Sequence, residues 1–219
     1  MNYVYIADNH NIWKSFLAEL KNRKQIKLEN LELIAELDNR IYGFEVKRDL
    51  IAVGQVFNKI SLLENKQLLY SSKNEKEGEI KVLAWANLQN LLVFVRDNQL
   101  ITLQKNEGKW QEKPLLKKSY EFGVITDIQF HPQDKYLAIF NEEEFFIYDF
   151  QTKYLCPSSI GFLNSVGAYY TKDWSKLVCP ANTELVIFDM SRQKFSYFPE
   201  YFQDDKRPGQ YWPIQTKKN

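Results

Sequence analysis

The stretch VITDIQFHPQDKYLAIFNEEEFFIYDF, from Val124 to Phe150, decides the fold. It holds three short apolar runs that two polar turns separate, and the third run closes on the pair Tyr148-Asp149. Runs rich in β-branched and aromatic residues, with tight polar turns between them, predict antiparallel strands. One such meander cannot bury both of its faces, so it requires neighbours of the same kind.

The same frame recurs along the chain. In each copy an aromatic residue ends one strand, five polar or turn residues follow, and a new apolar strand begins. The aromatic anchors are spaced 41, 45 and 40 residues apart: Phe44, Trp85, Phe130 and Tyr170. The pair Phe188-Asp189 follows Tyr148-Asp149 by 40 residues, which is the offset of their anchors.

A fourth, more polar strand lies between successive copies, near residues 66, 109, 153 and 194. Each unit thus has three apolar strands and one charged outer strand. Four-stranded units of about 40–45 residues that end in an aromatic-Asp pair are typical of β-propeller blades. We place the blades at residues 41–78, 79–122, 123–160 and 161–200.

Residues 41 to about 198 resemble the WD-repeat β-propeller family. The pairs Tyr148-Asp149 and Phe188-Asp189 stand where that family has its Trp-Asp dipeptide. This chain has neither a Gly-His pair ahead of a repeat nor a tryptophan in the dipeptide. The resemblance implies a rigid, non-catalytic scaffold, because the family mainly assembles protein complexes.

The two ends of the chain differ from the repeats. Asn2 to Ala7 alternates like a strand, and Leu31 to Leu37 predicts another. Between them, a short helix within residues 9–24, capped by Asn9 or Asn11, is expected from apolar side chains at helical spacing. Those side chains are Ile12, Trp13, Phe16, Leu17 and Leu20.

The closing tail, residues 201–219, has a turn signal at Pro208-Gly209 and then a short strand, Tyr211 to Thr216. When the two termini of a propeller share a blade, the free sheet edges disappear. We therefore expect one all-β domain over residues 1–219, with five blades, the last shared by residues 1–40 and the tail. Without that sharing, the chain is an open arc that a partner must complete.

Composition narrows the class of function. The 219 residues carry 29 basic and 28 acidic side chains, a net charge of +1, whereas proteins that bind nucleic acid usually carry a basic surplus. The N-terminal residues have no basic region ahead of an apolar core, and no window is long and apolar enough to cross a membrane. We expect a cytoplasmic protein with no cofactor and no metal, with Cys156 and Cys179 as reduced core residues.

The sequence does not predict a catalytic site. A glycoside hydrolase needs two carboxylates that face one channel, for which Glu45 and Asp127 are the candidates on inner strands. Asp127 is better explained by structure, as are His131 in its turn and the recurring Asp149 and Asp189. The chain contains no G-x-S-x-G elbow and no glycine-rich phosphate loop, so we expect that it is not an enzyme.

Recognition is expected in turns that the repeat places on one face of the disc, since loops on a rigid scaffold commonly carry binding. These turns join the second and third strands of three blades: Arg96, Asp97, Asn98, Glu142, Glu143, Glu144, Asn182 and Thr183. A second candidate is an aromatic partner patch in the tail: Tyr201, Phe202, Tyr211 and Trp212. The lysine-rich segment Lys105 to Lys118 could face RNA, although a charged strand that protects its own sheet edge is the commoner case.

The leading hypothesis is a non-enzymatic protein–protein interaction module, or a scaffold subunit of a larger complex, whose partner is another protein. A carbohydrate-active five-bladed propeller, either a glycosidase or a lectin, is the alternative from a different class. A protein that neutralises a toxin would also fit the binding class.

Overall fold

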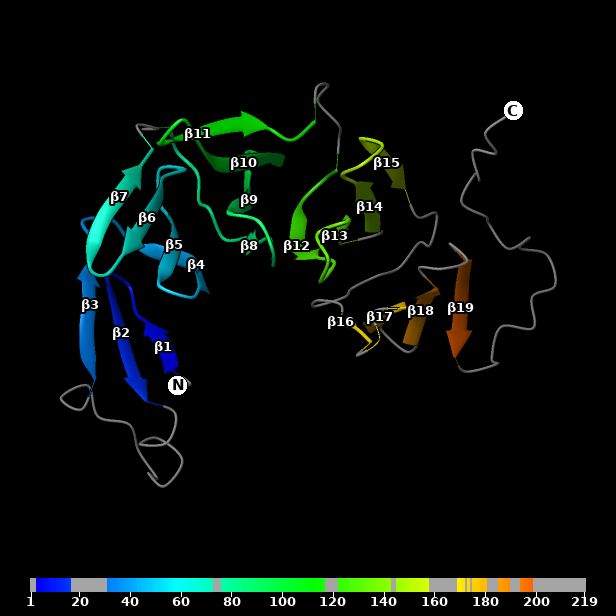
Figure 1. Cartoon of the computed structure of the whole chain (residues 1–219), viewed down its shortest axis with the longest axis horizontal. Helices are drawn as coiled ribbons and strands as arrows, with labels where there is room; N and C mark the ends of the chain where they lie inside the picture. The colour runs from blue at the N-terminus through cyan, green and yellow to red at the C-terminus, as the bar shows by residue number, and fades with distance from the viewer. Residues whose placement is uncertain are drawn as a thin grey trace. The chain divides into compact units, whose positions relative to one another are not determined.

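A computed structural model describes residues 3–16, 31–72, 76–116, 122–142, 145–157, 169–171, 173, 175–180, 185–189 and 194–198. In these residues every regular element is a β-strand (Figure 1). The chain forms two compact units, one of residues 1–85 and 92–117, the other of residues 86–91 and 118–219.

The first unit contains three antiparallel sheets, whose strands neighbour one another in chain order. A three-stranded sheet is formed by β1 (Tyr3–Ala7), β2 (Asn11–Phe16) and β3 (Glu32–Glu36). The next sheet is formed by β4 (Ile41–Lys47), β5 (Leu50–Gln55), β6 (Ile60–Glu64) and β7 (Gln67–Ser71). The third is formed by β8 (Leu83–Trp85), β9 (Leu91–Arg96), β10 (Gln99–Asn106) and β11 (Lys109–Pro114), although Leu91 groups with the second unit.

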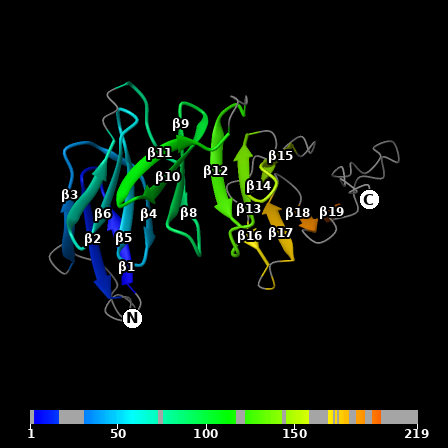
Figure 2. The same cartoon turned by 45° about the horizontal axis from the view of Figure 1, so that its top comes forward.

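The second unit contains two four-stranded sheets, and Figure 2 shows the strands of the first of them side by side. That sheet is formed by β12 (Ile125–Phe130), β13 (Tyr136–Asn141), β14 (Phe145–Asp149) and β15 (Tyr154–Pro157). The other is formed by β16 (Tyr169–Tyr170), β17 (Lys176–Pro180), β18 (Leu185–Asp189) and β19 (Lys194–Phe198).

The expected four-stranded antiparallel units are therefore confirmed. The aromatic-Asp pairs end β14 and β18, as the repeat predicts. Asp149 shows why the aspartate stands there: its Oδ1 accepts hydrogen bonds from the N–H groups of Gln151 at 2.7 Å and Thr152 at 3.2 Å. The carboxylate thus ends the strand by fixing the following turn.

The predicted N-terminal helix is wrong where the structure describes the chain, because Asn11–Phe16 is strand β2. Asp8 Oδ1 accepts the N–H groups of His10 and Asn11 at 2.9 and 2.8 Å, so a tight turn precedes this segment where a helix cap was expected. A register shift between Ile12 and Trp13 in the pairing with β3 interrupts the alternation of the strand. Both side chains are buried as a result, and two successive buried residues imitate the spacing of an amphipathic helix. Residues 17–24 of the expected helix lie outside the described residues.

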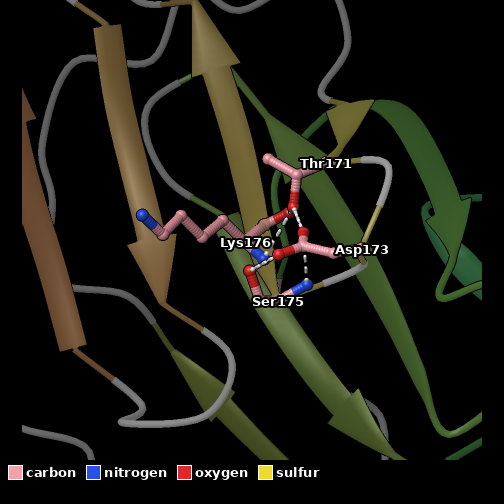
Figure 3. Close-up of a pocket in the computed structure, with 4 residues that line it drawn as sticks. All are labelled: Thr171, Asp173, Ser175 and Lys176. Atoms are coloured by element: carbon pink, nitrogen blue, oxygen red, sulfur yellow. Dashed lines mark hydrogen bonds between the residues drawn. The ribbon is translucent and has the colours of Figure 1, made fainter.

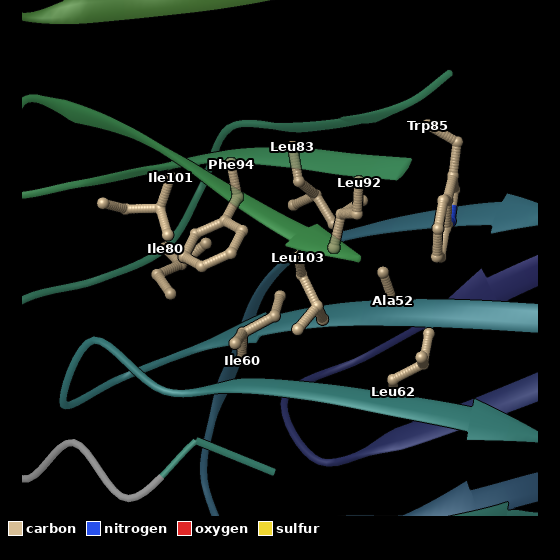
Figure 4. Close-up of a cluster of buried hydrophobic side chains, with 10 residues drawn as sticks. All are labelled: Ala52, Ile60, Leu62, Ile80, Leu83, Trp85, Leu92, Phe94, Ile101 and Leu103. Atoms are coloured by element: carbon tan, nitrogen blue, oxygen red, sulfur yellow. The ribbon is translucent and has the colours of Figure 1, made fainter. Parts of the chain in front are cut away.

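A hydrophobic cluster joins the two four-stranded sheets of the first unit (Figure 4). Its side chains come from β5, β6, β8, β9 and β10 and from the segment that leads into β8: Ala52, Ile60, Leu62, Ile80, Leu83, Trp85, Leu92, Phe94, Ile101 and Leu103. A second cluster, around Ile12, Ile51, Val53 and Leu63, joins the three-stranded sheet to its neighbour. Within the first unit, each sheet thus buries its face against the next, which is the stacking that the repeat requires.

Two paired glycines let the backbones approach where β4 and β5 meet the segment that leads into β8. A Cβ on Gly43 would lie 2.4 Å from the carbonyl oxygen of Lys81, and one on Gly54 would lie 2.2 Å from that of Ile80. The Ile80 N–H also donates to the Gln55 carbonyl at 3.2 Å. No larger residue fits at either glycine while this seam stays closed.

We expect Gly54→Ala to lower the free energy of unfolding by about 1–3 kcal/mol, because the added methyl group meets a fixed carbonyl. Urea unfolding of the full chain measures this change. Gly108→Ala is the control, since a Cβ there meets nothing within 4 Å and only its φ of +81° is unfavourable. A Gly54→Ala protein as stable as the wild type would contradict the close approach.

Candidate functional site

The candidate turn of the first unit follows β9, where Arg96 ends the strand and Asp97 and Asn98 form the bend. The latter two residues have φ values of +51° and +56°. Aspartate and asparagine tolerate this left-handed region better than other residues that carry a Cβ. Both are exposed, so the tip of the turn is available to solvent.

Asn58, in the turn between β5 and β6, holds the Asp97 turn in place. Its side-chain amide donates to Asp97 Oδ1 at 2.8 Å and to the Glu77 carbonyl at 3.0 Å. Its main-chain N–H donates to the Gly78 carbonyl at 3.1 Å, and its carbonyl accepts from Arg96 Nε at 3.1 Å. With 1% of its surface exposed, Asn58 is a buried polar residue whose groups are matched on three neighbouring segments.

Arg96 also forms an ion pair with Glu112 of β11, and Tyr70 of β7 completes this polar cluster. Arg96 Nη1 lies 2.5 Å from Glu112 Oε2, and the two side chains are 13% and 20% exposed. The Tyr70 hydroxyl donates to Glu112 Oε1 at 2.9 Å. Burial, followed by the hydrogen bond to that carboxylate, raises the pKa of Tyr70, so the phenol stays a hydrogen-bond donor at neutral pH.

We expect Glu112→Gln to lower the free energy of unfolding by about 2 kcal/mol, because it leaves the largely buried guanidinium of Arg96 without a countercharge. Chemical denaturation measures this change. Glu32→Gln is the control, since Glu32 pairs with Lys66 at 2.8 Å while both side chains are more than half exposed. If the two variants shift the midpoint equally, the cluster is no more than a surface pair.

Phe57 precedes Asn58 in the same turn and is the most unexpected residue of this region. Its φ is +60°, and its exposed fraction is 45%. Among the described non-glycine residues with positive φ, it is the one with an apolar side chain. Such a conformation costs a bulky residue on the order of 1–3 kcal/mol, so the position is strained.

The remaining predicted turn residues belong to the second unit. Glu142 is exposed and follows β13, and the neighbouring Asn141 is tied by its side-chain amide to the Phe122 carbonyl at 2.5 Å. Glu143, Glu144, Asn182 and Thr183 lie outside the described residues, as does the tail patch of Tyr201, Phe202, Tyr211 and Trp212. These sites stay predictions.

The two candidate catalytic carboxylates lie in different units. Glu45 is exposed on β4, while Asp127 is partly buried on β12, beside a register shift in its pairing with β13. The Asp127 carboxylate accepts the N–H of Ile128 at 2.9 Å. Burial raises the pKa of Asp127 above its ordinary value, and that hydrogen bond offsets only part of the rise.

We expect Asp127→Asn to raise the melting temperature at pH 7. A carboxyl group whose folded pKa is raised contributes its full stability below the unfolded pKa and loses it as the pH rises through the folded pKa. Asparagine keeps an acceptor for Ile128 and removes the charge, so its advantage should fade as the pH falls below about 4. Thermal unfolding between pH 3 and 7 tests this; lower stability of the variant at pH 7 would show that the ionised carboxylate is favourable.

The turn between β12 and β13 is structural. His131 is 6% exposed, accepts the Gln133 N–H on Nδ1 at 3.1 Å and packs edge-on against Tyr136 and Tyr170. Asp134, which the sequence did not single out, is 5% exposed. Its carboxylate accepts main-chain N–H groups from Asn87, Leu88 and Gln89 at 2.6, 2.7 and 3.0 Å.

A shallow depression lies at the turn between β16 and β17 and is lined by Thr171, Asp173, Ser175 and Lys176 (Figure 3). Asp173 accepts both hydroxyl groups, Thr171 Oγ1 at 2.6 Å and Ser175 Oγ at 2.9 Å. These bonds lower the pKa of Asp173 to about 2. The carboxylate is therefore committed to its own turn.

The described residues offer neither a metal site nor a membrane-spanning helix. In that part of the chain no group of three or more His, Cys, Asp or Glu side chains could hold a metal ion. The same residues contain no helix with the length and apolar character that crossing a membrane requires.

No model of a known protein family matches the sequence, and no curated protein matches it. Among solved structures, one similar chain belongs to a crystal structure of the mitotic checkpoint complex. The TM-score is 0.66 at 11% sequence identity, and the alignment covers 89% of this chain and 61% of that chain. The present chain thus spans less than two thirds of the matched chain, and the likeness shows the fold: it is a WD40-like β-propeller fold.

Proposed function

We propose that the chain is a non-enzymatic protein–protein interaction module, or a scaffold subunit that works inside a larger complex. The observation that carries this proposal is the Asn58 network, which fixes two exposed turns to each other. A turn held in one conformation loses little entropy when it binds, which favours recognition. The same proposal places the protein in the cytoplasm and assigns it no cofactor.

The WD40-like fold supports this function, since its exposed turns stand on sheets that stay rigid. The alternative, a carbohydrate-active propeller, lacks a comparable observation: Asp127 accepts its own neighbour's N–H, and Glu45 is an exposed residue of the other unit.

The test places positive charge on the predicted binding face. Asn98→Arg and Glu142→Arg should each weaken capture of a protein partner from an extract of the native cells, as followed by mass spectrometry. Glu107→Arg is the matched control, because Glu107 lies in the turn at the other end of β10. Equal capture by all three proteins would refute the proposed face, and absence of any specific partner would refute the function.

We propose further that the propeller has five blades and that Tyr211 to Thr216 adds a strand beside β1. Among the residues that the structure describes, the sheet of β1, β2 and β3 has one strand fewer than the other four, and β1 is its end strand. An added strand would remove an open edge that invites aggregation. Pro213 must then place its nitrogen away from the neighbouring strand, since it cannot donate a ladder hydrogen bond.

Deletion of residues 208–219 should lower the melting temperature and promote oligomers, because it uncovers that edge. Differential scanning calorimetry and sedimentation velocity measure the two effects. A truncated protein that stays monomeric and equally stable would show that the tail does not complete the blade.

A further inference from the structure

The two faces of the lysine-rich strand β11 carry different charges. Side chains of a strand alternate between the faces of its sheet, so Lys109, Gln111 and Lys113 share one face, which we call the lysine face. Trp110 and Glu112 share the other face, and Trp110 packs there against the hydrophobic cluster of the first unit. All three residues of the lysine face are exposed. This face of β11 therefore presents two cations and no carboxylate to solvent.

The one carboxylate of β11 is committed to the opposite face. Glu112 pairs with Arg96 at 2.5 Å and accepts a hydrogen bond from the Tyr70 hydroxyl at 2.9 Å. Charged side chains of either sign protect a sheet edge against unwanted pairing, so protection alone does not require the signs to be separated. Because the acid is turned away, the lysine face carries charge of one sign.

The lysine face has no countercharge among the residues that the structure describes. Neither Lys109 nor Lys113 forms an ion pair with any of them. Glu107 lies in the turn between β10 and β11, beyond the end of the strand. The residues of β10 that lie opposite the lysine face are neutral: Thr102, Gln104 and Asn106. Both positive charges are therefore available to an anionic ligand.

The strand β11 also has an open edge, because it is the end strand of its sheet (Figure 1). Just after it, the Leu115 N–H donates to the Leu100 carbonyl, next to β10, at 2.8 Å. Main-chain groups of an antiparallel strand alternate in direction, so the N–H and C=O groups of Trp110 and Glu112 face away from β10. These groups are free to bond to one further strand.

We propose that β11 binds an extended acidic segment of a partner protein as an added strand, with two carboxylates of that segment against Lys109 and Lys113. In strand addition the main-chain hydrogen bonds give affinity, and side chains at alternate positions give specificity. The two lysines are four residues apart, about 13 Å along the strand, so the two acids must have the same spacing. This inference rests on the proposed function and adds to it the chemistry of the partner segment.

RNA is the other ligand that a row of lysines attracts. Proteins that bind single-stranded RNA combine positive charge with aromatic side chains on which the bases stack. The aromatic residue of β11, Trp110, is turned to the hydrophobic cluster, where its ring centroid lies 6.5 Å from that of Trp85 in an edge-to-face arrangement. The lysine face thus offers charge without a stacking surface, which favours the acidic protein segment.

The test measures the binding of two fluorescent peptides to the full chain by anisotropy at low salt. The core of the first peptide is glutamate, valine, glutamine, valine, glutamate, which reads the same in both strand directions. The second peptide exchanges the last two residues, so that its second carboxylate falls on the other face of the added strand. We expect saturable binding of the first peptide, about three-fold or more tighter than that of the second and weakened by added salt.

Two variants of the full chain locate the site. The double variant Lys109→Gln with Lys113→Gln should weaken binding of the first peptide on the order of ten-fold, since each exposed ion pair contributes about two- to five-fold. Lys105→Gln is the matched control, because Lys105 is exposed on β10 opposite Trp110 and so belongs to the other face. It should change the affinity by less than about two-fold. Both proteins should melt within about 3 °C of the wild type, because these side chains are exposed.

Four results would overturn the proposal. If the wild type binds neither peptide, the lysines serve only to protect the sheet edge, and sedimentation velocity should then show oligomers of the double variant. Equal binding of the two peptides would show attraction of charge without an added strand. Unchanged affinity in the double variant would place the peptide elsewhere on the chain. Tighter binding of a fluorescent uridine oligonucleotide, lost in the double variant, would assign the lysine face to RNA.

The proposed function has a separate test, so the two can fail separately. If the peptide experiment fails while Asn98→Arg and Glu142→Arg still weaken capture of a partner, the chain is an interaction module whose β11 edge is not used. If no partner is captured at all, the function itself is refuted.

Discussion

The hydrogen bonds of one buried residue, Asn58, determine how the candidate turns of the first unit are arranged. A buried amide without partners costs about 1–3 kcal/mol, so each of its bonds restricts the positions that its neighbours can adopt. Asn58 bonds to the strand end at Arg96, to the turn at Asp97 and to the connection at Glu77 and Gly78. Moving any of these segments would leave a side-chain or main-chain polar group of Asn58 unmatched. Gly78 reflects the same constraint, because a Cβ there would lie 2.3 Å from the Asn58 amide nitrogen.

The strand pattern could be predicted because it is local. Alternating apolar residues and turn signals are visible within a dozen positions, and the anchors Trp85, Phe130 and Tyr170 do end β8, β12 and β16. Phe44 lies inside β4 instead, because pairing with β5 continues to Lys47. The helix expected near Ile12 failed for a related reason: a register shift hides the period of two. Short apolar segments are ambiguous until their cross-strand partners are known.

The polar contacts of the candidate site could not be predicted from the sequence, for a different reason. Asn58 and Asp97 are 39 residues apart, and Tyr70 and Glu112 are 42 apart, which is about one repeat. Glu112 stands in a lysine-rich strand that suggested either a charged sheet edge or a surface that faces RNA, yet its carboxylate bonds to Arg96. The repeat period could have indicated which residues come together, but not which side chains bond. The strain at Phe57 likewise depends on a backbone angle, which the sequence does not state.

The hydrogen bonds of Asp134 have a consequence for how the molecule unfolds. Its carboxylate accepts hydrogen bonds from the main-chain N–H groups of residues 87–89. Those residues group with the second unit, although they connect β8 and β9 of the first. The border between the two compact units therefore falls inside the β8–β9 hairpin and not at the end of a repeat. Native-state hydrogen exchange reports such borders, since amides that open together exchange together. We expect the amides at the tip of this hairpin to exchange together with those of the β12–β13 turn, because the Asp134 carboxylate joins the two segments.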